Sequence, residues 1–201
     1  MSGVSPWLLA LGDRSAELAP ELRAYFSTIP AGKVGRGRGT FHRLGTPRRW
    51  LWPVLAVLGR AGIIFPVWEH DVPFEIENRP DAAALHATRT FHTRRGELVM
   101  RDVVRMTAVG LTDTLGTERR LRVRLDAQVI DGSLELRSRG ASVRVGRLHI
   151  PLPLAPRVHL VERRDGARQR VELTMTMPLV GRVYEYSGSF DYEIVDTGET
   201  S

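Results

Sequence analysis

The chain has 201 residues, of which 42% are hydrophobic and 26% charged, a composition that excludes a disordered chain. It contains no cysteine, which excludes disulfides, thiolate metal sites and a cysteine nucleophile. The formal net charge is +6, and Lys33 is the only lysine among the 29 Lys and Arg residues. The arginines alternate with apolar residues instead of clustering beside stacking aromatic residues. We therefore interpret the charge as a solvated basic face and expect no nucleic-acid partner.

Two short helices are predicted in the N-terminal part of the chain, residues 5–30. Ser5-Pro6 offers an N-cap and a first-turn proline for a helix that ends at Gly12. A second helix is expected to start at Pro20 and to end before Pro30, with apolar residues at helical spacing between them.

The segment Lys33–Phe41 alternates small and basic residues and contains three glycines. As a strand it is weak, because glycine offers no side chain to pack, and we expect it to mark a bend where backbone approaches backbone. No Walker lysine or Rossmann spacing surrounds it, so it does not predict a phosphate-binding loop.

Thr46-Pro47 predicts the start of an apolar helical cap over residues 47–60. The most apolar part of the chain begins there and includes Trp50, Trp52 and Trp68. Arginines flank this segment, so it is suited to dock on a protein partner or on a membrane surface. The three tryptophans are our candidate interaction residues.

Neither secretion nor membrane insertion is predicted. The N-terminal apolar run, Trp7–Leu11, lacks the basic start of a secretory signal and is followed by acidic residues, so a cytoplasmic location is expected. The apolar segment that ends at Trp68 is interrupted by prolines, glycines and an arginine. A membrane helix needs about 20 predominantly apolar residues in succession, so this segment is not expected to span a bilayer.

From about His70 onward the hydrophobic period changes to two, which predicts half-buried strands. Each of several segments has its apolar residues on one face: Val72, Phe74 and Ile76; Leu121, Val123, Leu125, Ala127 and Val129; Val171, Leu173, Met175 and Met177; Tyr184, Tyr186, Phe190, Tyr192 and Ile194. Asp131-Gly132 and Asp165-Gly166 are hairpin-turn signals. Gly140 is expected to break one strand and Gly188 to permit close packing.

These patterns predict a mainly β protein of the α+β kind. Its core is a single strongly bent antiparallel sheet or a closed, calycin-like barrel of about nine strands. The helical segments would plug or cap it. We expect one domain over residues 1–196, followed by a disordered polar tail at 197–201.

Several motifs resemble the bacterial family called domain of unknown function 4166. The motifs are Arg89-x-Phe91, Asp131-Gly132-x-Leu134, Leu148-x-Ile150-Pro151-Leu152-Pro153-x-x-x-Pro156 and Pro178-Leu179-x-Gly181-x-x-x-x-Tyr186-x-Gly188. The resemblance runs from about Leu9 to Ile194. It differs at Ala87, where the family often has Trp. Family members frequently occur fused to, or beside, nucleotide-binding oxidoreductase or epimerase-like domains, so the resemblance implies an oxidoreductase-type partner. It implies no catalytic residues.

No pattern indicates a catalytic or metal site. His86 and His92 share one strand face but would lie ~20 Å apart, too far to bind one zinc ion. Asp71, Glu75 and Glu77 form a short acidic face that we expect to pair with arginines on neighbouring strands. No Gly-x-Ser-x-Gly nucleophile elbow occurs. We expect no metal, no cofactor and no catalytic residues, and we favour a protein that is not an enzyme.

The aromatic and methionine face of the last strands has two interpretations. It is either ordinary core or the inner wall of a barrel cavity. On the second interpretation the candidate ligand-binding residues are Phe74, Phe91, Met175, Tyr184 and Tyr186.

Three functional hypotheses follow. The first is a non-enzymatic module that binds a small lipophilic ligand, with the Trp-rich segment as a lid. The second is an interaction domain that docks through residues 50–68 on an oxidoreductase-type partner or a membrane surface. The third is an enzyme that uses Asp71, Glu75 or a strand histidine.

Overall fold

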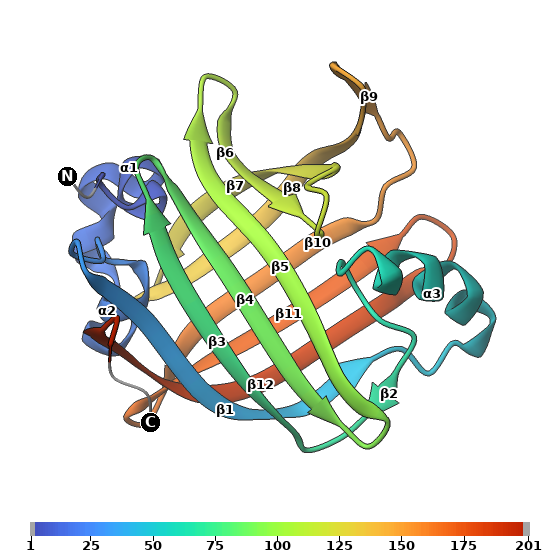
Figure 1. The fold of residues 1–201 in the computed structure, drawn as a ribbon, viewed down its shortest axis with the longest axis horizontal. Helices are drawn as coiled ribbons and strands as arrows, with labels where there is room; N and C mark the ends of the chain where they lie inside the picture. The colour runs from blue at the N-terminus through green and yellow to red at the C-terminus, as the bar shows by residue number, and fades with distance from the viewer. Residues whose placement is uncertain (1–2, 199–201) are drawn as a thin grey trace.

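The computed structural model describes residues 3–198, and ten of the strands in this range close into an antiparallel barrel (Figure 1). The barrel strands are β1 (Lys33–Gly45), β3 (Val72–Asp81), β4 (Ala84–Thr93), β5 (Gly96–Thr107), β6 (Gly110–Leu115), β7 (Leu121–Ile130), β8 (Ser133–Val145), β10 (Arg157–Asp165), β11 (Arg168–Met177) and β12 (Gly181–Asp196). They follow the order β10-β11-β12-β1-β3-β4-β5-β6-β7-β8 around the barrel, and pairing of β8 with β10 closes it. The closed alternative of the predicted fold is therefore the observed one.

Two further short strands lie outside the ring, so the described residues contain twelve strands rather than about nine. β2 (Trp68–Glu69) pairs with the end of β1, and β9 (Leu148–Pro151) pairs with β8. β9 begins the proline-rich motif Leu148-x-Ile150-Pro151-Leu152-Pro153, and prolines disfavour strand pairing. It pairs nonetheless, because Pro151 is the last residue of a short edge strand, where no ladder hydrogen bond from its nitrogen is needed.

The glycine-rich segment forms the first part of β1, a full strand between β12 and β3. A Cβ atom at Gly39 would lie 2.2 Å from the backbone oxygen of Ser189, and one at Gly188 would lie 2.4 Å from that of Thr40. Only glycine fits at such approaches. The close backbone approach predicted for this segment and for Gly188 is confirmed.

The prediction that Gly140 breaks a strand is wrong. β8 runs through this position, and its register against β7 shifts there: Gly140 pairs with Arg124 whereas Ser138 pairs with Leu125. Arg139 is thus the extra residue of a β-bulge, which bends the strand without ending it.

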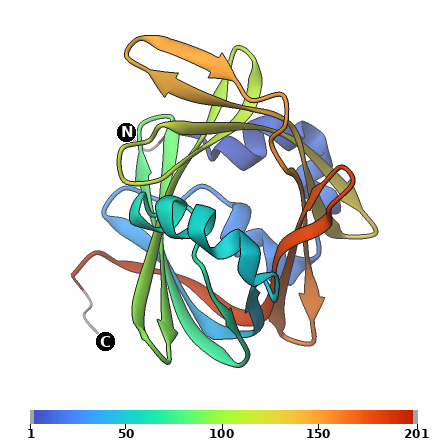
Figure 2. The ribbon, with the colours of Figure 1, turned by 90° about the vertical axis from the view of Figure 1, so that its right-hand side faces the viewer.

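Helices cover the two ends of the barrel (Figures 1 and 2). At one end lie α1 (Pro6–Leu11), the 3-10 helix η1 (Gly12–Glu17) and α2 (Pro20–Phe26). At the other end lie the 3-10 helix η2 (Arg49–Leu51) and α3 (Trp52–Arg60). The first two predicted helices begin at the expected prolines, which occupy first-turn positions. The predicted helix over 47–60 divides at Trp52, because Pro53 lacks an N–H group and fits only the first turn of an α-helix.

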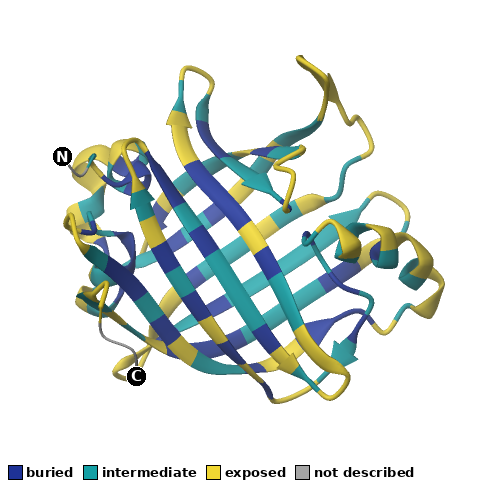
Figure 3. Ribbon diagram, viewed as in Figure 1, coloured by how far each residue is buried: buried dark blue, intermediate teal, exposed yellow. Residues whose placement is uncertain are grey.

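The barrel strands alternate buried and exposed residues, as Figure 3 shows for the strands that face the viewer. The buried side chains form one hydrophobic cluster, to which the N-terminal helices contribute Trp7 and Phe26 and the barrel contributes most of the rest. The helices therefore stabilise the barrel by closing its core. Among the described residues, no helix is long and apolar enough to cross a membrane.

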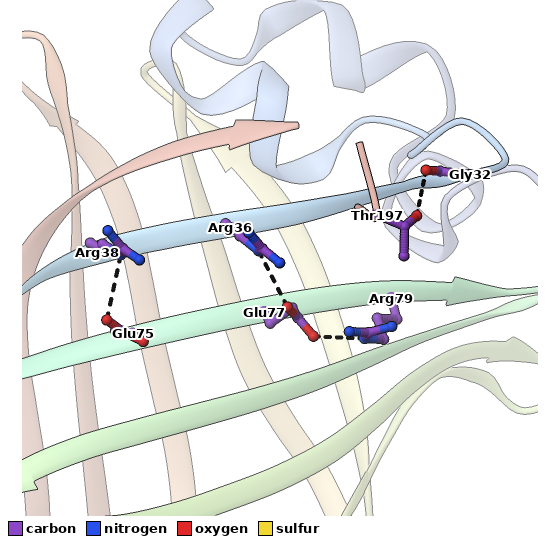
Figure 4. A network of polar contacts seen from close by, with 7 residues as sticks. All are labelled: Gly32, Arg36, Arg38, Glu75, Glu77, Arg79 and Thr197. Carbon is purple, nitrogen blue, oxygen red and sulfur yellow. Dashed lines mark hydrogen bonds and ion pairs between the residues drawn. The ribbon is translucent and has the colours of Figure 1, made fainter. Parts of the chain in front are cut away.

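The outer face of the barrel carries the acidic residues that the sequence analysis considered (Figure 4). Glu75 pairs with Arg38 at 3.4 Å, and Glu77 pairs with Arg36 at 3.3 Å, each across β1 and β3. The predicted cross-strand pairing with arginines is confirmed for these two carboxylates. At the start of the predicted tail, the Thr197 backbone N–H donates to the Gly32 oxygen at 3.0 Å, while residues 199–201 lie outside the described range.

Candidate ligand cavity

A cavity of about 360 Å³ lies inside the barrel, between the two helical ends. Trp7 and Tyr25 line it from α1 and α2, and Leu58 and Ile63 line it from α3 and the loop that follows. Most of the wall is aliphatic and comes from β5, β6, β7, β8, β10 and β11: Met100, Val104, Leu115, Leu121, Val123, Leu125, Leu136, Ala141, Val143, Val158, Leu160, Leu173 and Met175. Two lining residues, Arg120 and Leu152, are exposed, which locates the opening to solvent.

The cavity exists because the side chains on this part of the wall are small. Residues 92–183, which include all of β5 to β11, contain no Phe, Tyr or Trp. A barrel of ten strands is wider than one of eight, whose interior side chains just fill it. Aliphatic side chains alone therefore leave space in the interior on this side.

The opposite wall is filled by aromatic rings. Phe41, Phe74 and Phe190 come from β1, β3 and β12, with ring centroids of Phe41 and Phe74 4.2 Å apart and of Phe74 and Phe190 5.5 Å apart. Phe91 on β4 lies 5.5 Å from Phe41. These rings are buried and leave no space between them.

The structure divides the five candidate ligand-binding residues between these walls. Met175, Tyr184 and Tyr186 line the cavity. Phe74 and Phe91 do not; they are directly paired on β3 and β4 and pack within the aromatic cluster. A role in ligand binding stays a prediction for the first three residues, and the two phenylalanines are core.

A cluster of charged side chains lies in the cavity wall. Arg89 pairs directly with Asp102 through an Nη1–Oδ1 ion pair, and its Nη2 lies 3.5 Å from the Tyr25 hydroxyl. Asp113 follows one strand further along. Arg89 on β4 pairs with Met100 on β5, and Met100 lies two residues before Asp102. Asp102 in turn pairs with Leu115 on β6, and Leu115 lies two residues after Asp113. The three charged side chains are thus diagonal neighbours on one face of β4, β5 and β6.

A fourth charged residue, Glu162 on β10, completes this cluster. Its side chain is almost fully buried, and the Gln169 amide donates a hydrogen bond to its Oε2. Glu162 interacts electrostatically with Arg89, Tyr25 and Tyr186, so the cluster draws on both walls of the barrel.

Burial shifts the ionisation of these groups. It raises the pKa of Glu162 to about 7, against the opposing effects of Gln169 and Arg89. It also raises the pKa of Asp113 well above its usual range, and neighbouring Asp102 raises it further. The pKa of Asp102 is raised by burial too, although Arg89 opposes this shift. The cluster therefore contains carboxyl groups that retain protons at a pH where exposed carboxyls have lost them.

The candidate interaction residues lie in different environments. Trp50 in η2 is 62% exposed, and Val54 and Val57 on α3 are 60% and 63% exposed. Trp52 is half-buried; its Nε1 donates to the Thr46 backbone oxygen at 3.2 Å. Trp68 is also half-buried and lies in β2.

The residues of the enzyme hypothesis are not brought together. Asp71 and Glu75 are exposed on the outside of the barrel. His86 contacts Asp81 at 3.4 Å, and His92 contacts Glu97 at 3.3 Å. Within residues 3–198, no group of three or more histidine and carboxylate side chains has a metal-binding arrangement.

A comparison with protein families identifies one that covers most of the chain. The family described as "Domain of unknown function (DUF4166)" matches residues 18–190. The chain belongs to this family. The resemblance inferred from the turn and strand motifs is therefore confirmed. A comparison with curated proteins finds none that matches.

The DUF4166 match begins within the N-terminal helical region and ends in β12, so it includes all four charged residues of the cavity. The sequence analysis assigned these residues no role. Each lies between apolar neighbours two residues away on at least one side: Arg89 beside Phe91, Asp102 between Met100 and Val104, Asp113 between Leu111 and Leu115, and Glu162 beside Leu160. A charged residue among apolar residues on one strand face was the sequence pattern that could have predicted these four cavity residues.

Proposed function

We propose that the protein is a non-enzymatic module that binds a small lipophilic molecule inside its barrel. The observation that carries this proposal is the cavity of about 360 Å³ with a mainly aliphatic wall and a few convergent polar groups. Pockets of this size and character are typical of small-molecule sites. The aliphatic part of the wall offers water no hydrogen-bond partners, so an apolar ligand would gain contacts there.

The proposal is tested by native mass spectrometry of the purified protein, followed by solvent extraction. We expect a reproducible excess mass of a few hundred daltons (on the order of a drug-sized ligand) that solvent releases. An apo mass, together with no binding of the neutral apolar dye Nile red, would contradict the proposal.

A matched pair of variants locates the binding. Met175 lines the cavity, whereas Thr174 is its neighbour on β11 and points to the other face of the sheet. Met175→Trp should fill the cavity and abolish dye binding, and Thr174→Trp should leave it intact. Equal loss of binding in both variants would contradict an interior site.

A second candidate function is docking on an anionic membrane surface. Trp50, Val54 and Val57 are exposed together, and their spacing of four and three residues places them on one face of the η2–α3 segment. Arg49 and Arg60 lie at the two ends of this segment. An apolar face flanked by arginines is the composition of an interfacial helix. The oxidoreductase-type partner that the family resemblance implies stays a prediction.

Vesicle co-sedimentation tests the docking. We expect the protein to bind vesicles that contain phosphatidylglycerol more strongly than pure phosphatidylcholine vesicles. Trp50→Ser combined with Val57→Ser should abolish the binding, because both side chains are exposed and hold no core contacts that folding needs. Val109→Ser, an equally exposed position in the β5–β6 turn, is the control and should bind as the unmodified protein does. Unchanged binding by the double variant would rule out this surface.

A further inference from the structure

We propose that the charged inner part of the cavity binds the protonated amine of an amphipathic ligand, with Asp113 and Glu162 as the groups that hold it. This inference rests on the proposed ligand-binding function and names the ligand class: a primary amine attached to an apolar body. The apolar body would occupy the aliphatic part of the cavity.

The cluster holds more carboxyl groups than cations. The cluster contains three carboxyl groups, those of Asp102, Asp113 and Glu162, and one guanidinium, that of Arg89. Arg89 is engaged by Asp102, with which it forms the direct ion pair, and its second Nη reaches Tyr25. Two carboxyl groups are thus left without a cation of their own inside the cavity.

The other arginine of the wall does not compensate them. Arg120 lies at the start of β7, its side chain is 65% exposed, and it pairs with Glu118. It belongs to the opening of the cavity, whereas Asp102 and Glu162 are buried. Arg89 is thus the one cation that the cavity lining offers to the inner carboxyl groups within residues 3–198, and a ligand can supply another.

One buried carboxyl oxygen of the cluster is placed to receive the ligand. The Oδ1 atom of Asp113 is buried and has no hydrogen-bond partner within residues 3–198. Such an orphaned acceptor costs free energy unless something binds it. Asp113 lines the cavity, so a donor group of a ligand can reach it. An ammonium group offers three donors and one positive charge, which suits an acceptor beside other carboxyl groups.

Further polar groups face the site from three other elements. Glu162 accepts from Gln169 on β11, and Tyr25 and Tyr186 interact electrostatically with Glu162 and Asp102 from α2 and β12. Burial raises the pKa of the Glu162 and Asp102 carboxyl groups and of the Tyr25 and Tyr186 hydroxyl groups. A bound ammonium would stabilise the ionised carboxylates that burial penalises, and it would replace the protons they hold.

A metal ion is a poorer occupant than an organic cation. The described residues offer no group of three side chains arranged to bind a metal. The aliphatic wall beside the cluster suits a ligand whose charge is confined to one end.

The test compares three ligands of equal chain length: decylamine, 1-decanol and decanoic acid. Their affinities for the unmodified protein are measured by displacement of Nile red at pH 8. We expect decylamine to bind roughly ten times more tightly than 1-decanol, because a charged hydrogen bond contributes about 1.5–3 kcal/mol. Decanoic acid should bind most weakly. Binding of 1-decanol or decanoic acid as tightly as decylamine would overturn the inference.

Two isosteric variants assign the groups. Asp113→Asn and Glu162→Gln should each weaken decylamine binding about tenfold and leave 1-decanol binding unchanged. Glu75→Gln, on the outer face, is the control and should change neither. If a cavity variant fails to fold, the comparison of the three ligands with the unmodified protein still decides the question.

The pH profile gives an independent readout. Decylamine keeps its proton near neutral pH, whereas Glu162, whose pKa is about 7, loses one. Decylamine affinity should therefore rise by about tenfold from pH 6 to pH 8, and this rise should shrink in Glu162→Gln. A flat profile would contradict the role of Glu162.

The outcomes separate the two proposals. If Nile red and 1-decanol bind but decylamine has no advantage, the cavity binds neutral lipophilic ligands and only the amine inference fails. If neither Nile red nor any of the three ligands binds, the ligand-binding function fails, and the amine inference fails with it.

Discussion

The two halves of the barrel interior differ in how completely side chains fill them. On β1, β3, β4 and β12, aromatic rings pack edge to face or tilted against one another, and the glycines of β1 make room for them. On β5 to β8, β10 and β11, the inward side chains are aliphatic and border a cavity. Both halves belong to one hydrophobic cluster. The difference indicates that the aromatic half supplies the packing that stabilises the barrel, whereas the aliphatic half supplies the space for a ligand.

The largest loss of stability should come from removing a ring from the aromatic half of the barrel interior. Phe41 is fully buried and contacts the rings of Phe74, Phe91 and Tyr186. Phe41→Ala should lower the free energy of unfolding by about 3–5 kcal/mol, measured by urea denaturation. Leu173→Ala, on the wall of the cavity, should cost about 2 kcal/mol, the low end for such a change, because that side chain already borders empty space. Equal costs would show that the two halves are packed alike.

The next effect concerns the charged cluster in the cavity wall. Burial raises the pKa of Glu162 from 4.5 to about 7, so the folded state holds its proton more tightly than the unfolded state does. The stabilisation that this proton provides is complete below pH 4.5 and is lost as the pH rises through 7. Asp113, whose pKa is also raised, acts in the same direction.

Glu162→Gln removes this dependence while keeping the shape of the side chain. At pH 8 the variant should be more stable than the unmodified protein by roughly 3 kcal/mol, and at pH 4 the difference should nearly vanish. Urea denaturation at both pH values measures it. A variant that is less stable at pH 8 would indicate that the ionised carboxylate has a compensating partner in the folded protein.

A third effect comes from adding volume to each half. Ile76 is buried in the filled half, so Ile76→Phe should destabilise the protein by about 1–3 kcal/mol through overpacking. Leu173→Phe places its ring in the cavity and should change the free energy of unfolding by less than about 1 kcal/mol. Thermal unfolding of the two variants, recorded side by side, compares them. A large loss in Leu173→Phe would mean that the cavity wall cannot accommodate a ring.

The barrel itself could be predicted from the sequence, because alternation of apolar residues and hairpin signals are local patterns. Closure of the barrel could not be predicted in this way. It depends on pairing of β8 with β10, which β9 separates in the sequence, and no local pattern specifies that pairing. The sequence predicted only a weak strand at β1, because glycines lack a side chain to pack. In the structure other side chains, such as Phe190, pack onto these glycines. The bulge at Gly140 has the same sequence signal as a strand end.

The candidate site was only partly predictable for a related reason. Tyr184, Tyr186 and Met175 were found because a large side chain on an inward face suggests a wall. The cavity itself exists because residues 92–183 contain no aromatic side chains that would fill the interior. Phe74 and Phe91 pack within the aromatic cluster and do not line the cavity, since a large ring fills space rather than bordering it.

The smallest change in stability should come from the ion pairs on the outside of the barrel. Like Arg89 and Asp102 they join an arginine to a carboxylate, but they are exposed to solvent. The Arg38 and Glu75 side chains are both largely exposed, so water screens their interaction (Figure 4). Glu75→Gln should change the free energy of unfolding by less than about 1 kcal/mol. Asp102→Asn should cost several times more, because it removes the buried carboxylate that forms the direct ion pair with Arg89. Urea denaturation of both variants in low and high salt checks this contrast: salt should diminish the outer effect and leave the inner one almost unchanged. Equal salt sensitivity would mean that the cavity wall is open to solvent, which would weaken the charge argument for a bound amine.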